Sequence, residues 1–143
     1  MIKFEYPVLL TPVEEGGFVV TCRDLPEVIT QGENEQDALR QASDAMEEAF
    51  AVRINDCLDF PQPSRRRRNE LLVSPPAGMV AKAALYVAMR EANVTKIDLA
   101  KRLGIDEREV RRLLDPHHGS RLPRIEAAID SLGMRLRIEL ARS

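Results

Sequence analysis

The sequence predicts an α+β protein in which a small domain of strands and one helix precedes a mainly helical domain. Apolar and polar residues alternate in the first half, a pattern typical of half-buried strands. Apolar residues recur every three or four positions in the second half, as they do in amphipathic helices. Between the halves, proline-rich stretches flank Arg65–Arg68, and no single regular element accommodates that composition.

These patterns divide the chain into three segments. The first domain covers 1–60 and extends to about 74, a Pro/Arg-rich linker with a short strand covers 61–78, and the second domain covers 79–143. Because runs of like charge are usually solvated, we interpret the four arginines as a solvated linker. A phosphate-binding arm is the less favoured alternative.

Four strands are expected in the first domain. Alternation over 2–10 predicts the first strand, 14–17 supply a glycine-containing turn, and 18–22 predict the second strand of a hairpin. Short apolar runs predict a third strand at 28–30 and a fourth at 70–73.

One long helix is expected between the third and fourth strands. Asn34 is a favourable N-cap, and acidic Asp37 lies beside the N–H groups that the first turn leaves free. The helix should continue to about Arg53. One of its faces carries the apolar residues Ala38, Leu39, Ala42, Met46, Ala49 and Phe50. The first domain is therefore a βββαβ unit in which the helix covers one face of the sheet.

The second domain is predicted to contain four helices and a terminal strand. A helix over 79–92 precedes one that begins after Thr95 and ends at Gly104, and Asp106 caps the next. A final helix covers 122–132. The tail alternates again, with apolar residues at Met134, Leu136, Ile138 and Leu140. A lone strand needs a partner, so this tail pairs either with its own sheet or with a second copy, which favours a dimer.

The segment 96–113 has the spacing of a helix-turn-helix. Gly104 permits the left-handed turn that a side chain resists. The positions that meet the steric requirements of the motif are Leu99, Ala100, Leu103, Gly104, Ile105, Val110 and Leu113. An ordinary helical hairpin is the alternative, because such hairpins share this pattern.

In a helix-turn-helix the second helix enters the major groove. We expect Arg108 and Arg111 near base edges, because arginine donates two hydrogen bonds to guanine. The candidate DNA-binding residues are Thr95, Lys96, Glu107, Arg108, Arg111, Arg112 and Arg121. Residues 95–124 carry 8 basic and 5 acidic residues. That excess is modest, so we expect a dimer that binds two half-sites.

The charges of the two halves have opposite signs. Residues 1–60 contain 4 Lys/Arg and 13 Asp/Glu, whereas residues 61–143 contain 17 Lys/Arg and 10 Asp/Glu. An acidic module attracts a basic partner, and a basic module attracts a polyanion. The asymmetry therefore favours a protein partner for the first half and nucleic acid for the second.

Several classes of protein are disfavoured. No run approaches the roughly 20 apolar residues that cross a bilayer, and early charges such as Lys3 and Glu5 argue against a secretory signal. The expected location is the cytoplasm. Two cysteines, Cys22 and Cys57, and adjacent His117 and His118 offer little for a disulfide framework or a zinc site. We expect no metal and no cofactor.

A metal-dependent nuclease needs several carboxylates that converge on divalent ions. The candidates by residue type are Asp24, Glu27, Glu47 and Glu48. We interpret them as part of a solvated acidic surface, because Asp24 precedes Leu25-Pro26 in a loop and the two helical glutamates lie on the polar side. The sequence also lacks a phosphate-binding glycine loop and a Ser/His/Asp set, so we do not expect an enzyme.

Short motifs along the chain resemble the HicB family of antitoxins. In the first half they are Tyr6-Pro7, Glu15-Gly16-Gly17-Phe18, Asp24-Leu25-Pro26-Glu27, Thr30-Gln31-Gly32-Glu33 and Ala38-Leu39. In the second half the resemblance is to the helix-turn-helix branch of the family, at Lys82, Leu85, Leu99 to Gly104, Arg112 to Pro116, His118 and Leu132-Gly133. The chain departs at Glu27-Val28, where members often have Gly-Cys.

This resemblance implies a type II antitoxin. Its first half would have a partial RNase H-like fold and would mask a HicA-type toxin, a small basic ribonuclease that cleaves mRNA. Its second half would bind the operator of its own operon and repress it, with the toxin as co-repressor, and the protein would form dimers or higher oligomers. The candidate toxin-binding residues are Glu14, Glu15, Asp24 and Glu27, with Tyr6 and Phe18 as apolar contacts.

A stand-alone transcriptional regulator with a ligand-sensing first domain is the alternative function. It needs a pocket lined by apolar and a few polar groups. The chain has only six aromatic residues, which leaves little material for such a pocket in a thin sheet-plus-helix domain. A short basic reading frame beside the gene favours the antitoxin, and a metabolic operon favours the regulator.

Overall fold

The computed structural model describes residues 2–142 and confirms a mixed α and β chain. Contacts between residues separate two compact units, with the boundary between Val80 and Ala81. The elements of the first unit are β1 (Tyr6–Pro12), β2 (Phe18–Thr21), β3 (Ile29–Gly32), α1 (Glu35–Asn55) and β4 (Glu70–Val73). Those that follow are α2 (Ala77–Ala92), α3 (Lys96–Leu103), α4 (Glu107–Leu114) and α5 (Leu122–Asp130).

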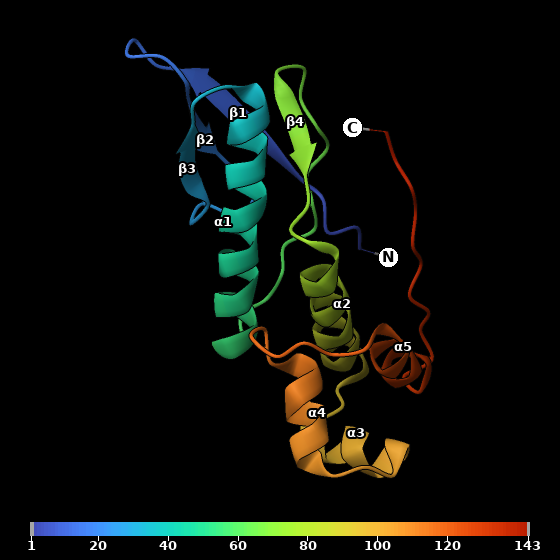
Figure 1. Ribbon diagram of the computed structural model, residues 1–143. Helices are drawn as coiled ribbons and strands as arrows, with labels where there is room; N and C mark the ends of the chain where they lie inside the picture. The colour runs from blue at the N-terminus through green and yellow to red at the C-terminus, as the bar shows by residue number, and fades with distance from the viewer. Residues whose placement is uncertain (1, 143) are drawn as a thin grey trace. The chain divides into compact units, whose positions relative to one another are not determined.

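The four strands form one antiparallel sheet in the order β3-β2-β1-β4, and α1 lies along one face of it (Figure 1). The expected fourth strand is therefore present, paired with β1. Leu9 of β1 lies opposite Thr21 of β2 on one side and Glu70 of β4 on the other. These three residues share the sheet face opposite to that of buried Val8, because alternate residues of a strand point to opposite faces.

The N-terminus of α1 follows the expected cap. The side chain of Asn34 accepts a hydrogen bond from the backbone N–H of Asp37 at 2.8 Å. Close approach of α1 to β3 depends on a glycine, because a Cβ at Gly32 would lie 2.3 Å from the backbone nitrogen of Ala38. Any side chain at Gly32 would therefore push the helix from the sheet.

Aromatic rings fill the core between the sheet and α1. The ring of Phe50 lies 4.7 Å from that of Phe60, 5.8 Å from that of Phe4 and 6.0 Å from that of Tyr6, measured between centroids. The arrangements are edge-to-face, which aromatic quadrupoles favour. Because Phe60 belongs to the segment after α1, that segment packs into the core of the first unit.

The strand expected over 134–140 does not form within the single chain, which contains no strand after α5 in the described residues. Pairing with a second copy, the other expectation for this tail, stays a prediction. Ile138 and Leu140 are largely exposed, with relative accessibilities of 76% and 102%. The alternating pattern is present, but a strand forms only beside a partner strand, and the sheet of the described residues contains only β1 to β4.

Candidate nucleic-acid interface and partner surface

The helices α3 and α4 are joined by a short turn at Gly104, Ile105 and Asp106. Gly104 adopts a left-handed conformation with φ 65° and ψ 36°, as its position in the sequence predicts. The backbone N–H of Ile105 donates to the carbonyl of Ala100 at 3.0 Å and closes the end of α3. This turn sets the direction in which α4 leaves α3.

Both helices have capped N-termini. Thr95 and Asp98 form a reciprocal capping box, with both hydrogen bonds 3.1 Å long. Asp106 accepts from the N–H of Arg108 at 2.8 Å. Each bond from a backbone N–H favours the charged carboxylate and lowers the pKa of Asp98 and of Asp106. These caps stabilise helices of only eight residues, which are too short to be stable alone.

The inner face of this helix pair is apolar. Leu99, Val110 and Leu113 are buried, and Ala100 is buried beside them. Leu103 and Ile105 are half-buried. The positions expected to face the core therefore do so.

The outer face of α4 carries arginines. Arg108, Arg111 and Arg112 are exposed. Arg111 donates to Glu107 one turn earlier at 2.7 Å, and Arg108 lies 3.7 Å from Asp106. Such exposed pairs contribute little to stability, so these guanidinium groups are free to exchange an intramolecular partner for an anion.

Lys82 of α2 holds the C-terminal end of α4. Its ammonium group is buried and donates to the carbonyls of Arg112 at 3.1 Å and Leu113 at 3.0 Å, and to Ser120 Oγ at 3.0 Å. Helix C-termini favour a cation because their last carbonyls lack partners. Burial lowers the pKa of Lys82. This role of Lys82 was not predicted from the sequence. A lysine within an otherwise apolar helix is the signal that could have indicated it.

The remaining candidate DNA-binding residues are exposed, as Lys96 is at the start of α3 and Arg121 is at the start of α5. Arg121 forms no side-chain cap. Thr95 is also exposed, but its hydroxyl already accepts the N–H of Asp98. These positions are compatible with contacts to a DNA backbone, which remain a prediction.

The candidate toxin-binding residues separate into different environments. Glu14 and Glu15 are exposed in the turn between β1 and β2, and Phe18 is half-buried. Glu27 pairs with Arg53 at 2.7 Å. Burial is the largest single influence on Glu27 and raises its pKa. The hydrogen bond and the charge of Arg53, together with a backbone hydrogen bond, outweigh burial and leave the pKa lowered. The carboxylates of Glu14 and Glu15 in the turn are therefore more available to a partner than that of Glu27.

The position of Tyr6 argues against a direct contact with a toxin. It is fully buried, and its hydroxyl donates to the carbonyl of Pro61 at 2.8 Å. Burial raises the pKa of this hydroxyl. The alternation that suggested an apolar contact instead places the ring in the core, where it packs against Phe50.

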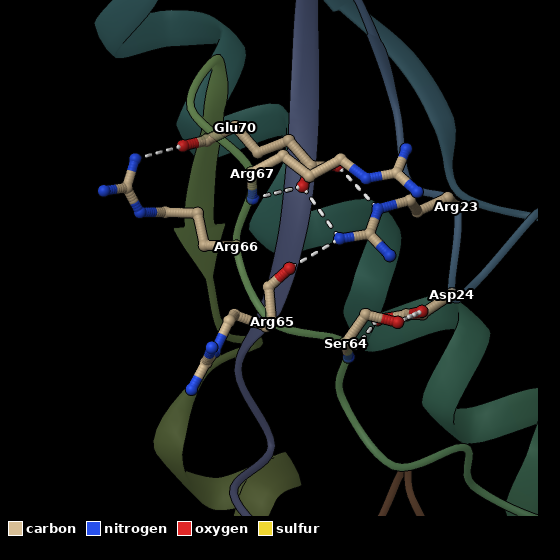
Figure 2. Close-up of polar contacts among 7 residues, drawn as sticks. All are labelled: Arg23, Asp24, Ser64, Arg65, Arg66, Arg67 and Glu70. Carbon is tan, nitrogen blue, oxygen red and sulfur yellow. Dashed lines mark hydrogen bonds and ion pairs between the residues drawn. The ribbon is translucent and has the colours of Figure 1, made fainter.

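Asp24 contacts Ser64, beside a second group of polar contacts among Arg23, Glu70 and the linker arginines (Figure 2). Both oxygens of Asp24 accept hydrogen bonds from Ser64, one from its backbone N–H and one from its hydroxyl. Arg23 donates from Nε and Nη2 to the two oxygens of Glu70, each at 2.9 Å. The hydrogen bond from Arg23 lowers the pKa of Glu70 to about 2, although burial opposes it. Asp24 is therefore engaged within its own unit.

Two kinds of feature are absent from residues 2–142. No group of three or more His, Cys, Asp or Glu side chains is placed to hold a metal ion within this range. Within the same range, no helix is long and apolar enough to span a bilayer.

Comparisons with known proteins agree over most of the chain. Residues 5–84 match the model of a family described as HicB-like antitoxin of bacterial toxin–antitoxin systems. Antitoxin HicB of Escherichia coli strain K12 is 34% identical over 131 residues, which are 92% of this chain and 95% of that protein. Antitoxin HicB 1 of Photorhabdus laumondii is 33% identical over 138 residues, covering 96% and 88% of the two chains. Antitoxin HicB of Pseudomonas fluorescens is 32% identical over 136 residues, covering 94% and 92%.

Proposed function

Because this chain belongs to the family of HicB-like antitoxins of bacterial toxin–antitoxin systems, we propose that it neutralises a HicA-type toxin and represses its own operon. The toxin is a small basic ribonuclease that cleaves mRNA. In this proposal the first unit, with a partial RNase H-like fold, binds the toxin, and the second unit binds operator DNA. The protein acts by binding, without catalysis of its own, and works in the cytoplasm.

The observation that carries the DNA-binding proposal is the α3–α4 pair. A capped helix, a left-handed glycine turn and a second capped helix are the parts of a helix-turn-helix, and α4 is its recognition helix. Arg108 and Arg111 lie on the exposed side of α4, and in this proposal they donate to guanine edges. Lys96, Arg112 and the residues flanking the pair supply contacts to phosphates.

Charge supports the proposed toxin-binding role of the first unit. Residues 1–60 have nine more acidic than basic residues, and this excess attracts a basic ribonuclease and speeds its encounter. Glu14 and Glu15 extend from the turn between β1 and β2, where a partner has access to them. Phe18 at the start of β2 adds apolar surface beside this turn.

The alternating tail supports self-association. Residues 134–140 keep the period of a strand while their apolar side chains Ile138 and Leu140 remain exposed. Pairing with the same segment of a second copy satisfies the backbone groups of both and covers these side chains. Such a dimer provides the two DNA-reading helices that two operator half-sites require.

Two binding experiments test the proposal. In a gel-shift assay with the DNA upstream of its own operon, the wild type should bind and the Arg108→Ala/Arg111→Ala variant should lose most of this binding. Arg40→Gln/Arg53→Gln serves as a control that removes the same charge from the first unit. Equal binding by the wild type and the α4 variant would refute the DNA-binding role.

The toxin-binding role is tested by isothermal titration of the folded chain with the protein from the adjacent basic reading frame, without DNA. We expect a saturable heat, which Glu14→Gln/Glu15→Gln reduces. Glu47→Gln/Glu48→Gln on α1 is the matched control for charge. Absence of heat with the wild type would refute toxin binding, whereas equal loss in both variants would assign the effect to net charge alone.

A further inference from the structure

The four consecutive arginines, Arg65–Arg68 or the arginine segment, have no role in the function proposed above. They belong to a unit in which residues 1–80 contain 8 Lys/Arg and 14 Asp/Glu, so their charge opposes that of their surroundings. All four are exposed. A concentration of positive charge in an acidic unit requires a physical explanation beyond the solubility of a linker.

The backbone of the arginine segment is fixed to the sheet. Arg23 Nη2 donates to the carbonyl of Arg65 at 2.7 Å, and the N–H of Arg67 donates to Glu70 Oε1 at 2.8 Å. Arg66 Nη1 donates to the carbonyl of Glu70 at 3.0 Å, while the N–H of Glu70 donates to the carbonyl of Arg67 at 3.1 Å. Figure 2 shows the bond from Arg23 to the carbonyl of Arg65, that from the N–H of Arg67 to the Glu70 carboxylate and that from Arg66 to the Glu70 carbonyl. The segment is thus an ordered turn leading into β4.

Glu70 is engaged mainly by Arg23 and by the backbone of the arginine segment. It receives two hydrogen bonds from Arg23 and one from the N–H of Arg67, so three of its roughly four acceptor sites are occupied. The guanidinium groups of Arg65, Arg67 and Arg68 form no hydrogen bond or salt bridge with another residue in the range 2–142. One carboxylate therefore fixes a surface that keeps several unpaired positive charges.

We propose that the arginine segment is a second nucleic-acid contact, in which exposed guanidinium groups on a fixed turn bind the phosphate backbone. A guanidinium group matches the oxygens of a phosphate with two parallel hydrogen bonds. Because Arg23 and Glu70 already order the backbone, binding costs less conformational entropy than it would for a flexible tail. Repeated phosphates also match adjacent arginines better than a single small anion does. This contact does not depend on the reading of bases by α4.

The proposal is tested with the full chain and the Arg65→Gln/Arg68→Gln variant. The side chains of Arg65 and Arg68 form no hydrogen bond or salt bridge within residues 2–142. Arg66 and Arg67 are retained, because Arg66 donates a hydrogen bond to the carbonyl of Glu70 and the charge of Arg67 acts on the Glu70 carboxylate. The probes are a labelled duplex DNA without operator sequence and a labelled single-stranded RNA of the same length. Affinity is measured by fluorescence anisotropy over a series of salt concentrations, and circular dichroism confirms folding.

We expect the variant to bind at least one probe about tenfold more weakly at about 0.1 M salt. For duplex DNA, the slope of log affinity against log salt should fall by about 2, because each phosphate contact contributes about 0.9 to it. Loss on the duplex alone identifies DNA as the ligand, and loss on the RNA alone identifies RNA. The same loss in an Arg108→Ala/Arg111→Ala background separates this contact from that of α4.

Three results would overturn the proposal. The first is an equal loss in Lys3→Gln/Arg40→Gln, which removes the same charge from the same unit. The second is unchanged affinity and slope for both probes. The third is a larger loss of affinity for polyglutamate than for either nucleic acid, because the segment would then be a surface for an acidic polypeptide.

Discussion

Glu70→Gln tests the network that fixes the first unit. The hydrogen bond from Arg23 is the largest of the influences that lower the pKa of Glu70 from 4.5 to about 2, and the N–H of Arg67 and the charges of both arginines add to it. At about 1.4 kcal/mol for each unit of pKa, this difference corresponds to about 3.5 kcal/mol in the folded state. Arg23 keeps 29% of its side chain exposed, and solvent screening lowers the expected loss of stability to about 1–2 kcal/mol at pH 7.

The pH dependence follows from the lowered pKa. The unfolded chain binds more protons than the folded chain between about pH 4.5 and pH 2. The contribution of Glu70 is therefore complete above about pH 4.5 and disappears as the pH falls toward 2. The stabilities of the wild type and the variant should differ at pH 7 and converge toward pH 2.

The assay is urea unfolding followed by amide resonances of β1 and β4, because circular dichroism would combine both units. Glu48→Gln, at an exposed position of α1 without a hydrogen-bond partner in residues 2–142, controls for loss of one charge. A difference below about 0.5 kcal/mol at pH 7, within the range of an ordinary surface pair, would refute the calculation. So would a difference that stays constant down to pH 2.

Three further predictions concern the second unit. Lys82→Met should lower the free energy of unfolding of the second unit by about 1–3 kcal/mol, because carbonyls near the end of α4 lose a buried donor. Urea unfolding followed by amide resonances of α4 measures the loss, and an unchanged midpoint would contradict it. Gly104→Ala should cost about 1–2 kcal/mol in the same assay, because φ is 65° while no atom lies within 4 Å of the added Cβ; no loss would contradict the left-handed turn. Arg111→Ala should weaken operator binding by about 1–3 kcal/mol and relax the preference at one base pair, whereas uniform weakening on all sequences would assign Arg111 to phosphate.

Local signals predicted the elements of the fold well. The strand at 70–73 and the helices on either side of Gly104 lie where alternation, caps and glycine placed them, because each of these signals acts within a few residues. The tail after Gly133 shows the limit of this reasoning. A strand depends on a neighbour as well as on its own pattern, and a pattern does not specify whether that neighbour exists in the same chain.

The candidate sites were predicted less completely, since they depend on contacts between distant residues. The caps Thr95 and Asp106 were identifiable from their positions alone. The burial of Tyr6 and the engagement of Asp24 by Ser64 depend on how the segment after α1 returns to the sheet. The prolines and arginines of that segment led to its interpretation as a linker. Amino-acid composition does not reveal the distant carbonyls and carboxylates that hold the segment in place.

Lys82 shows why the proposed DNA-binding face of α4 depends on residues that would not touch DNA. A helix of eight residues gains little from its own hydrogen bonds, so packing and end contacts set the position of α4. Asp106 fixes one end and Lys82 the other, and the exposed arginines lie between them. Loosening either end lets the guanidinium groups move relative to one another, which costs affinity because base contacts require fixed geometry. A loss of DNA affinity in Lys82→Met therefore follows from the same bonds that stabilise the fold.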